Sequence, residues 1–322
     1  MLFAILLSIA VGTVFIPPAD LWRVLTGQPP QTVEQAAVIV LTLRLPRTAL
    51  VLLTGAALGA SGAAYQGVFR NPLADPYLIG AASGAGLGAV LAMSVQWPYT
   101  TAGLLAVPAA AFIGALAAVF LVYLLGRVGK TVPTTNLILA GVAFSAFASA
   151  LTSYLMLRST GELRRAIAWL LGGSAQAGWE PVLAVLPFLV LGLVGLLLSG
   201  HTLNVLQFGD DQASQMGLPV ARARTLILLA ASLATASAVA FSGIIGFIGL
   251  IVPHLMRLWF GADYRRLLSL SLVGGAAALL LADVLARLVM APQELPVGIV
   301  TALAGAPFFL WALRRAKNQG YW

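Results

Sequence analysis

The chain has 322 residues, of which 60% are hydrophobic and only 9% are charged. Soluble domains carry about 25% charged residues, so this composition excludes a water-soluble globular protein. The formal charge of +8 comes from scattered arginines and lysines, not from a basic helix, which argues against nucleic-acid binding. The chain has no cysteine and only two histidines, which argues against a disulfide framework and against a zinc or iron–sulfur site.

Ten apolar stretches follow one another along the chain, each near the roughly 20 residues that cross about 30 Å of hydrocarbon. They predict an all-α, polytopic membrane protein with about ten transmembrane helices in a single transmembrane domain over residues 1–322. The first stretch is short for a full crossing, so we interpret it as a truncated span. The expected spans are 2–16, 46–68, 77–95, 104–125, 134–157, 181–199, 224–241, 244–260, 268–289 and 297–313.

The distribution of positive charge gives the chain an orientation. With ten spans and the N-terminus inside, 11 of the 18 basic residues fall on the cytoplasmic side, in agreement with the positive-inside rule. We therefore expect a multi-pass protein of the cytoplasmic (inner) membrane. The basic residues left on the outer side are the unusual ones, and they are Arg23, Arg44, Arg47, Arg158, Arg164, Arg165 and Arg287.

Two of the segments between spans are longer than a turn and carry structure signals. The inner segment 200–223 contains the helix-breaking run Gly217-Leu218-Pro219, which predicts two short helices around a bend. The outer segment 158–180 carries Trp169 and Trp179, which favours a short helix at the membrane surface with tryptophan at headgroup depth.

The outer motif Arg44-Leu45-Pro46-Arg47 places two arginines where a helix is expected to begin. Proline suits the first position of a helix, so Pro46 predicts the outer start of the second span. Positive charge at a helix N-terminus opposes the helix dipole, at a cost of about 0.3 to 1 kcal/mol per exposed charge. An external anionic partner would account for Arg44 and Arg47, and lipid headgroups or internal carboxylates are the alternatives.

Asp283 and Arg287 lie four residues apart near the outer end of the ninth span. Intramembrane charges are expensive unless they are paired or hydrated, so a mutual ion pair is the simplest interpretation. The other is that Asp283 carries protons, which would make the chain a secondary transporter coupled to an ion or proton gradient.

The chain lacks a nucleotide-binding motif. Gly129-Lys130-Thr131 resembles the end of a phosphate-binding loop, but Leu124 stands where the first glycine is needed, and an apolar span precedes it instead of a strand. If transport is driven by ATP, the ATPase is another chain, and this chain performs no covalent chemistry.

Polar residues on the fifth span point to a translocation pathway. Asn136, Ser145, Ser149 and Ser153 give that span a partly polar face, which we interpret as pathway lining. The glycine-rich runs, such as 55–62, have small-residue spacings that favour close helix packing.

Two blocks of sequence resemble the permease family that imports cobalamin, haem and iron–siderophore complexes, within the type II ATP-binding-cassette importers. The first block contains Arg44-Leu-Pro-Arg47, the glycine-rich run 55–62, Gln66 and Asn71-Pro-Leu-Ala-Asp-Pro76. The second runs from Gly243 through His254 and Arg257 to Asp283-Val-Leu-Ala-Arg287, Glu294-Leu-Pro-Val-Gly298 and Gly305-Ala-Pro-Phe308.

The resemblance implies a homodimer of ten-span subunits around a central pathway, two cytoplasmic ATPase subunits that use ATP and magnesium, and an extracytoplasmic binding protein. It implies no cofactor in this chain. By position, Arg44, Arg47 and Arg287 match the residues that meet carboxylates on the binding protein. The coupling segment that docks into the ATPase matches residues Ala213, Gln215, Met216, Gly217, Leu218, Pro219 and Arg222.

The main alternative is the secondary transporter coupled through Asp283, and a channel is a third. Segment 200–223 distinguishes them, because a permease coupled to an ATPase needs a docking element and a secondary carrier does not. The cargo stays open among iron chelate, haem and cobalamin, because no haem- or metal-ligating cluster is evident.

Overall fold

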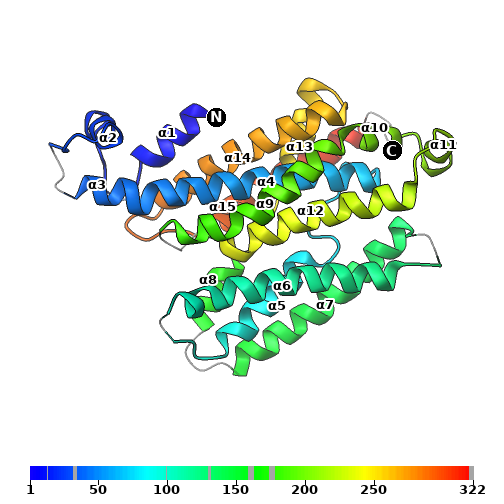
Figure 1. Ribbon diagram of the computed structural model, residues 1–322, viewed down its shortest axis with the longest axis horizontal. Coiled ribbons are helices and arrows are strands. Elements are labelled where there is room, and N and C mark those ends of the chain that lie inside the picture. Colours follow the sequence, from blue (N-terminus) through cyan, green and yellow to red (C-terminus); the bar gives the residue numbers. More distant parts are fainter. Residues whose placement is uncertain are drawn as a thin grey trace.

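The computed structural model describes residues 1–12, 14–31, 35–98, 100–129, 132–158, 163–173 and 178–318, and over these residues the protein is helical, without β-strands. Lys130 and Thr131 of the rejected nucleotide motif lie outside the described residues. The helices shown in Figure 1 are α1 (Leu2–Ala10), α2 (Pro18–Leu25), α3 (Ala36–Val38), the π-helix η1 (Ile39–Arg44), α4 (Leu45–Phe69), α5 (Ala81–Met93), α6 (Thr101–Gly126), α7 (Thr134–Arg158), α8 (Leu163–Leu170), α9 (Glu180–Leu198), α10 (Gly200–Leu206), α11 (Asp210–Gln215), α12 (Val220–Ser242), α13 (Ile248–Phe260), α14 (Tyr264–Leu288) and α15 (Val297–Asn318).

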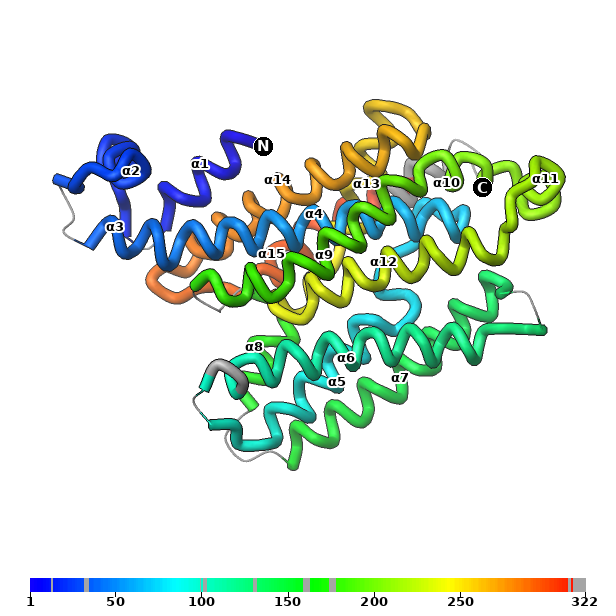
Figure 2. Tube along the Cα trace, viewed as in Figure 1, coloured from blue at the N-terminus to red at the C-terminus, as the bar shows by residue number. Residues whose placement is uncertain are grey.

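The long helices run side by side along the longest axis of the molecule, in two groups (Figures 1 and 2). One group contains α4, α9, α12, α13, α14 and α15, and the other contains α5 to α8. Helix α12 packs against α5 and α6 and so joins the two groups. We call the two ends of this bundle the α2 end and the α11 end, after the short helices that lie there.

Six helical segments of the described chain are long and apolar enough to cross a membrane: 36–69, 103–126, 134–158, 180–198, 220–242 and 264–288. Helix α5, helix α13 and residues 297–311 are apolar but shorter, and α1 has only nine residues. Each of the ten expected spans therefore overlaps a helix, but by length and composition six of them qualify as crossings.

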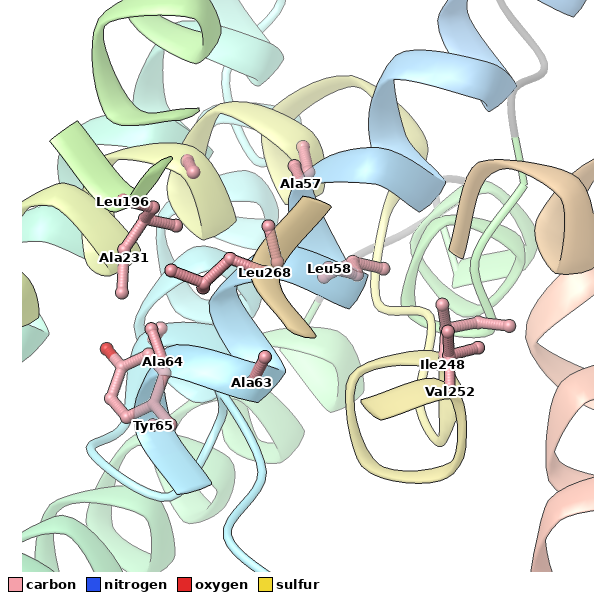
Figure 3. Close-up of a cluster of buried hydrophobic side chains, with 14 of the residues drawn as sticks. Ala57, Leu58, Ala63, Ala64, Tyr65, Leu196, Ala231, Ile248, Val252 and Leu268 are labelled. Atoms are coloured by element: carbon pink, nitrogen blue, oxygen red, sulfur yellow. The ribbon is translucent and has the colours of Figure 1, made fainter. Parts of the chain in front are cut away.

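Helix α4 is the central helix, with most of its residues buried between α12, α13 and α14. The glycines predicted to permit close packing do so: a Cβ on Gly55 would collide with the backbone oxygen of Gly275, and one on Gly62 with that of Gly249. Figure 3 shows the core around this helix, where the ring of Tyr65 is fully buried and its hydroxyl lies 2.8 Å from Ser232 Oγ. Small residues thus bring the backbones together.

The structure corrects the expected start of the second span. Helical structure begins at Ala36, ten residues before Pro46, and continues through η1 into α4. Proline lacks an N–H and its ring clashes with the carbonyl four residues earlier, so the regular α-helical hydrogen bond to that carbonyl cannot form here. The π-helical turn from Ile39 to Arg44, which ends just before Pro46, accommodates it.

The first expected span is also corrected. Helix α1 ends at Ala10, and Val11 is already extended, with ψ of 133°. The chain after Val11 contains Gly12 and then the pair Pro17-Pro18. Helix α2 begins at Pro18, so the chain starts a new helix here and does not continue α1. Helix formation over 2–16 was expected from hydrophobicity alone, which does not distinguish a helix from a buried extended segment.

Candidate docking and coupling sites

Asp283 is the centre of a charged cluster at the α2 end of the bundle. Arg47, on α4, donates to Asp283 Oδ1 from Nε at 3.2 Å and from Nη2 at 2.9 Å. Arg287 Nε lies 3.1 Å from the other carboxylate oxygen, which confirms the predicted ion pair one helical turn apart. Arg47 also donates from Nη1 to Glu294 at 2.7 Å, so this arginine bridges two carboxylates.

Arg44 is held by main-chain carbonyls of the N-terminal segment. Its guanidinium reaches away from its own helix and donates to Ile9 and Ala10 at the end of α1, at 2.8 Å each, and to Val14 in the segment that follows. The last carbonyls of a helix have no partner within it and carry partial negative charge. Arg44 therefore caps α1 with hydrogen bonds to carbonyl oxygens that lie within the chain.

Arg287 caps the same end of α1 from the opposite helix. It donates to the carbonyl of Ser8 at 3.1 Å and to that of Val11 at 2.8 Å. The Ser8 hydroxyl in turn lies 2.8 Å from Thr48 Oγ1 on α4. Two guanidinium groups, from η1 and α14, thus hold the end of α1 in place through its main chain.

The three predicted docking arginines differ in accessibility. Arg44 and Arg287 are only 7% and 3% exposed. The Arg47 side chain is 19% exposed, and its partner Glu294 is 42% exposed. Arg47 is therefore the member of the three that a partner reaches most readily, while the other two are committed to α1 and Asp283.

A cavity of about 390 Å³ opens beside this cluster, between the two groups of helices. Arg47, Asp283 and Glu294 line one side, and Arg165 and Trp169 of α8 line another. Helix α8 is the short helix that was predicted for segment 158–180. Its Trp169 was expected at headgroup depth, but it lines this cavity. Trp179 is 46% exposed, as an anchor at headgroup depth should be, and donates to the carbonyl of Leu41 at 3.2 Å.

At the opposite end of the bundle, segment 200–223 contains two short helices, α10 and α11, as its sequence predicted, but both precede the run Gly217-Leu218-Pro219, which instead separates α11 from α12. Gly217 has φ of +85°, and the amides of Gly217 and Leu218 donate to the carbonyls of Ser214 and Ala213. This is the Schellman arrangement that ends a helix on a left-handed glycine. The bend is thus fixed by backbone hydrogen bonds.

Residues of the predicted coupling segment project from this bend. Ala213 is fully buried and Leu218 is partly buried, and these two attach the segment to the bundle. The exposed residues are Gln215, Met216, Gly217, Pro219 and Arg222. Met216 is 60% exposed, so its apolar side chain projects from the bend.

Asp210 connects the coupling segment to two long helices. Its carboxylate accepts hydrogen bonds of 2.9 and 3.1 Å from Arg224 on α12, and Arg70 at the end of α4 lies 3.5 Å away. These contacts link the start of α11 to α4 and α12.

Asp263, just before α14, accepts from the Arg265 guanidinium and from the Asn204 amide of α10. These two donors hold the pKa of Asp263 well below its usual range.

The predicted pathway residues lie on α7, which packs against α5 and α6. Ser145 is partly buried and accepts a 3.1 Å hydrogen bond from Ser83 on α5, and Asn136 is also partly buried. Ser149 and Ser153 lie on the exposed face of the helix. The structure therefore does not bring the four together around one cavity within a single chain.

Sequence reasoning missed two acidic residues as partners in these sites. Glu294 and Asp210 each hold an arginine that comes from a distant part of the chain, 247 and 14 residues away. An available signal for Glu294 was position, because it stands in the short connection after the expected span that carries Asp283 and Arg287. Asp210 offered no such signal, because it lies in the middle of the inner segment 200–223. His254 packs edge-on against Phe308, and the described residues contain no group of His, Cys, Asp or Glu that could hold a metal ion.

The sequence and fold of this chain were compared with those of known proteins. The FecCD transport family model matches residues 1–315. The chain belongs to this family. It is 46% identical over 281 residues to the cobalamin import system permease protein BtuC of Halobacterium salinarum, covering 87% of this chain and 74% of BtuC. It is 43% identical over 287 residues to the hemin transport system permease protein HmuU of Yersinia pestis, covering 87% and 84%.

A solved structure supports the same assignment. An inward-facing conformation of a metal-chelate type ABC transporter superposes with a TM-score of 0.86 and 32% identity, and covers 98% of this chain and 96% of that chain. This FecCD chain is therefore a multi-pass permease subunit of the inner membrane. Family membership decides against the secondary transporter and the channel, and the double pairing of Asp283 agrees with a structural role.

Proposed function

We propose that this FecCD permease crosses the membrane about ten times as one domain, with α1, α5, α13 and α15 as the shorter crossings, and works as a homodimer. Two cytoplasmic ATPase subunits would bind ATP and magnesium, and an extracytoplasmic binding protein would deliver cargo. The α2 end faces outward and the α11 end faces the cytoplasm. The excess of basic residues at the α11 end supports this orientation.

The outer charged cluster is the proposed docking site for the binding protein. Arg47 would make the direct contact, because it is the accessible arginine of the three and already binds carboxylates. A carboxylate of the binding protein would replace exposed Glu294 on Arg47 while buried Asp283 stays bound. Arg44 and Arg287 contribute to the same surface by fixing the end of α1.

The bend of segment 200–223 is the proposed coupling element. Exposed Gln215 and Met216 would contact the ATPase, Arg222 would lie beside them at the membrane surface, and Ala213 and Leu218 would attach the element to the bundle. Because Asp210 binds both Arg224 and Arg70, closure of the ATPase pair would move α12 and α4 relative to their neighbours.

The exposed face of α7 is the proposed pathway lining. In a dimer, Ser149 and Ser153 would face the central space, where polar side chains tolerate exposure better than they do in lipid. The relatives import cobalamin and hemin, so we propose that the cargo is cobalamin, haem or an iron–siderophore complex.

The single observation that carries this proposal is the bridging of Asp283 and Glu294 by Arg47, and charge reversal tests it. In proteoliposomes that contain the permease, its ATPase and its binding protein, Arg47→Glu should abolish the stimulation of ATP hydrolysis by the binding protein. Arg164→Glu, at an exposed outer arginine away from the cluster, should leave it intact. Unchanged stimulation by Arg47→Glu would remove the docking role.

A second measurement tests the energy source. The permease reconstituted without its ATPase should transport no cargo when an ion gradient is applied. Uptake driven by the gradient alone would overturn the ATP-driven mechanism.

A further inference from the structure

An apolar groove of about 570 Å³ lies between α9 and α12, beside the coupling bend. Its floor is formed where Gly195 approaches Ala230 so closely that a Cβ on the glycine would lie 3.0 Å from the alanine Cβ. Its walls are exposed leucines, among them Leu198 at 79% and Leu226 at 66%. The volume is in the range of small-molecule ligand sites, about 300 to 1,000 Å³.

The groove has the length of one membrane leaflet. Its lining on α9 and α10 runs from Leu191 to Thr202, which is eleven residues at about 1.5 Å each, or roughly 17 Å. Half of a hydrocarbon core of about 30 Å is about 15 Å. On the proposed orientation, the groove therefore spans the cytoplasmic leaflet, with its polar lining residues Ser199 and Thr202 toward the headgroups.

Positive charge lies at the headgroup end of the groove. Arg222 precedes Leu226, Leu229 and Leu233 by four, seven and eleven residues, so it falls on the face of α12 that lines the groove. It is exposed, and it has no ion pair with any residue that the structure describes. The nearby acid Asp210 is occupied by Arg224.

We propose that this groove binds one acyl chain of an anionic phospholipid whose phosphate is held by Arg222. Guanidinium groups bind phosphate with strong charge-assisted hydrogen bonds, and the apolar walls match the chain. Leu218 and Pro219 of the coupling bend also line the groove, so a bound lipid would pack directly against the coupling element. The assignment of the groove to the cytoplasmic leaflet rests on the orientation given under the proposed function. Binding of a lipid in the groove does not depend on transport activity.

Native mass spectrometry of the purified permease in mild detergent tests the site. The detergent-washed protein is incubated with equal concentrations of phosphatidylglycerol and phosphatidylcholine, and the retained lipids are counted. The wild-type chain should retain one phosphatidylglycerol in preference to phosphatidylcholine. Arg222→Gln should reduce this preference about tenfold, and Arg266→Gln, an exposed arginine of α14 outside the groove, should not change it.

Filling the groove gives an independent variant. Ala230→Phe should expel both lipids, whereas Leu183→Phe, on an exposed part of α9 outside the groove, should have no effect. Equal retention of the two lipids by the wild-type chain, or equal effects of Arg222→Gln and Arg266→Gln, would overturn the proposal. These counts are made without cargo or ATP, so they stand apart from any failure of the transport mechanism.

A second copy of the chain is the competing occupant of the groove. The chain has no cysteine, so Leu198→Cys and Leu226→Cys each introduce a single thiol. We expect neither variant to form a disulfide-linked dimer in the membrane under mild oxidation, because lipid covers the groove. Efficient crosslinking at either position would assign the groove to a contact between copies and overturn the lipid site.

Discussion

Arg47 and Asp283 are joined by two hydrogen bonds although 236 positions separate them in the chain. They fasten the outer start of α4 to the outer end of α14, which are also packed together along their length through glycine. The same carboxylate pairs with Arg287, so one buried negative charge compensates two arginines.

Replacing Asp283 should therefore be costly. Asp283→Asn leaves Arg47 and Arg287 with a poorer partner at a site that is 1% exposed. Breaking a buried ion pair by removing one partner typically destabilises a protein by about 3 to 5 kcal/mol. We expect a large drop in the thermal unfolding temperature of the variant in detergent.

A double variant provides the control for that prediction. Adding Arg287→Gln removes one of the uncompensated charges, so the loss in Asp283→Asn/Arg287→Gln should be smaller than the sum of the two single losses. Additive losses would mean that the two residues do not interact energetically.

Glu294 should behave in the opposite way. It is 42% exposed, and an exposed ion pair contributes only about 0.2 to 1 kcal/mol, so Glu294→Gln should hardly affect stability. The substitution frees one side of Arg47 for an outside carboxylate. We expect the affinity for the binding protein to rise, as measured by surface plasmon resonance on nanodisc-embedded permease. A fall in affinity would show that Glu294 takes part in docking itself.

Gly217→Ala should act on the coupling bend through the backbone alone. No atom lies within 4 Å of a Cβ built on Gly217, but its φ of +85° costs an alanine about 1 to 2 kcal/mol. We expect weaker coupling between ATP hydrolysis and transport, with normal membrane insertion. Gly246→Ala is the matched control, because Gly246 also has open space but no positive φ. Equal behaviour of the two variants would show that the left-handed turn is unimportant.

Gly62→Ala should disrupt the bundle itself. The added Cβ would collide with the backbone of Gly249 on α13, and backbone atoms do not move aside cheaply. We expect a loss of folded protein in size-exclusion profiles after extraction. Gly173→Ala, where the nearest atom would lie 3.8 Å from the new Cβ, should express normally.

The sequence predicted those features that depend on neighbours along the chain. The Asp283–Arg287 pair follows from four-residue helical spacing, and the bend at Gly217 follows from a glycine and a proline two residues apart. The long apolar helices follow from hydrophobic length alone. The family blocks then supplied the functional class, which periodicity does not contain.

The remaining features depend on which helix ends meet in space. Arg44 looked unfavourable at a helix N-terminus because the carbonyls that it binds belong to α1, some 30 to 35 residues earlier. Arg47 looked available for an outside anion because nothing local indicated that α14 would place Asp283 beside it. The π-helical turn before Pro46 was missed because a proline marks a break in hydrogen bonding without specifying how the chain resolves it.

The way in which α1 is held has a consequence for how its sequence can change. Arg44 and Arg287 bind chiefly carbonyl oxygens, which every amino acid provides, so the side chains of Ile9, Ala10, Val11 and Val14 are not what these arginines recognise. Homologous subunits could exchange these residues for others of similar bulk without releasing the segment. Loss of either arginine, by contrast, would remove hydrogen-bond donors from these carbonyls whatever the sequence of the segment.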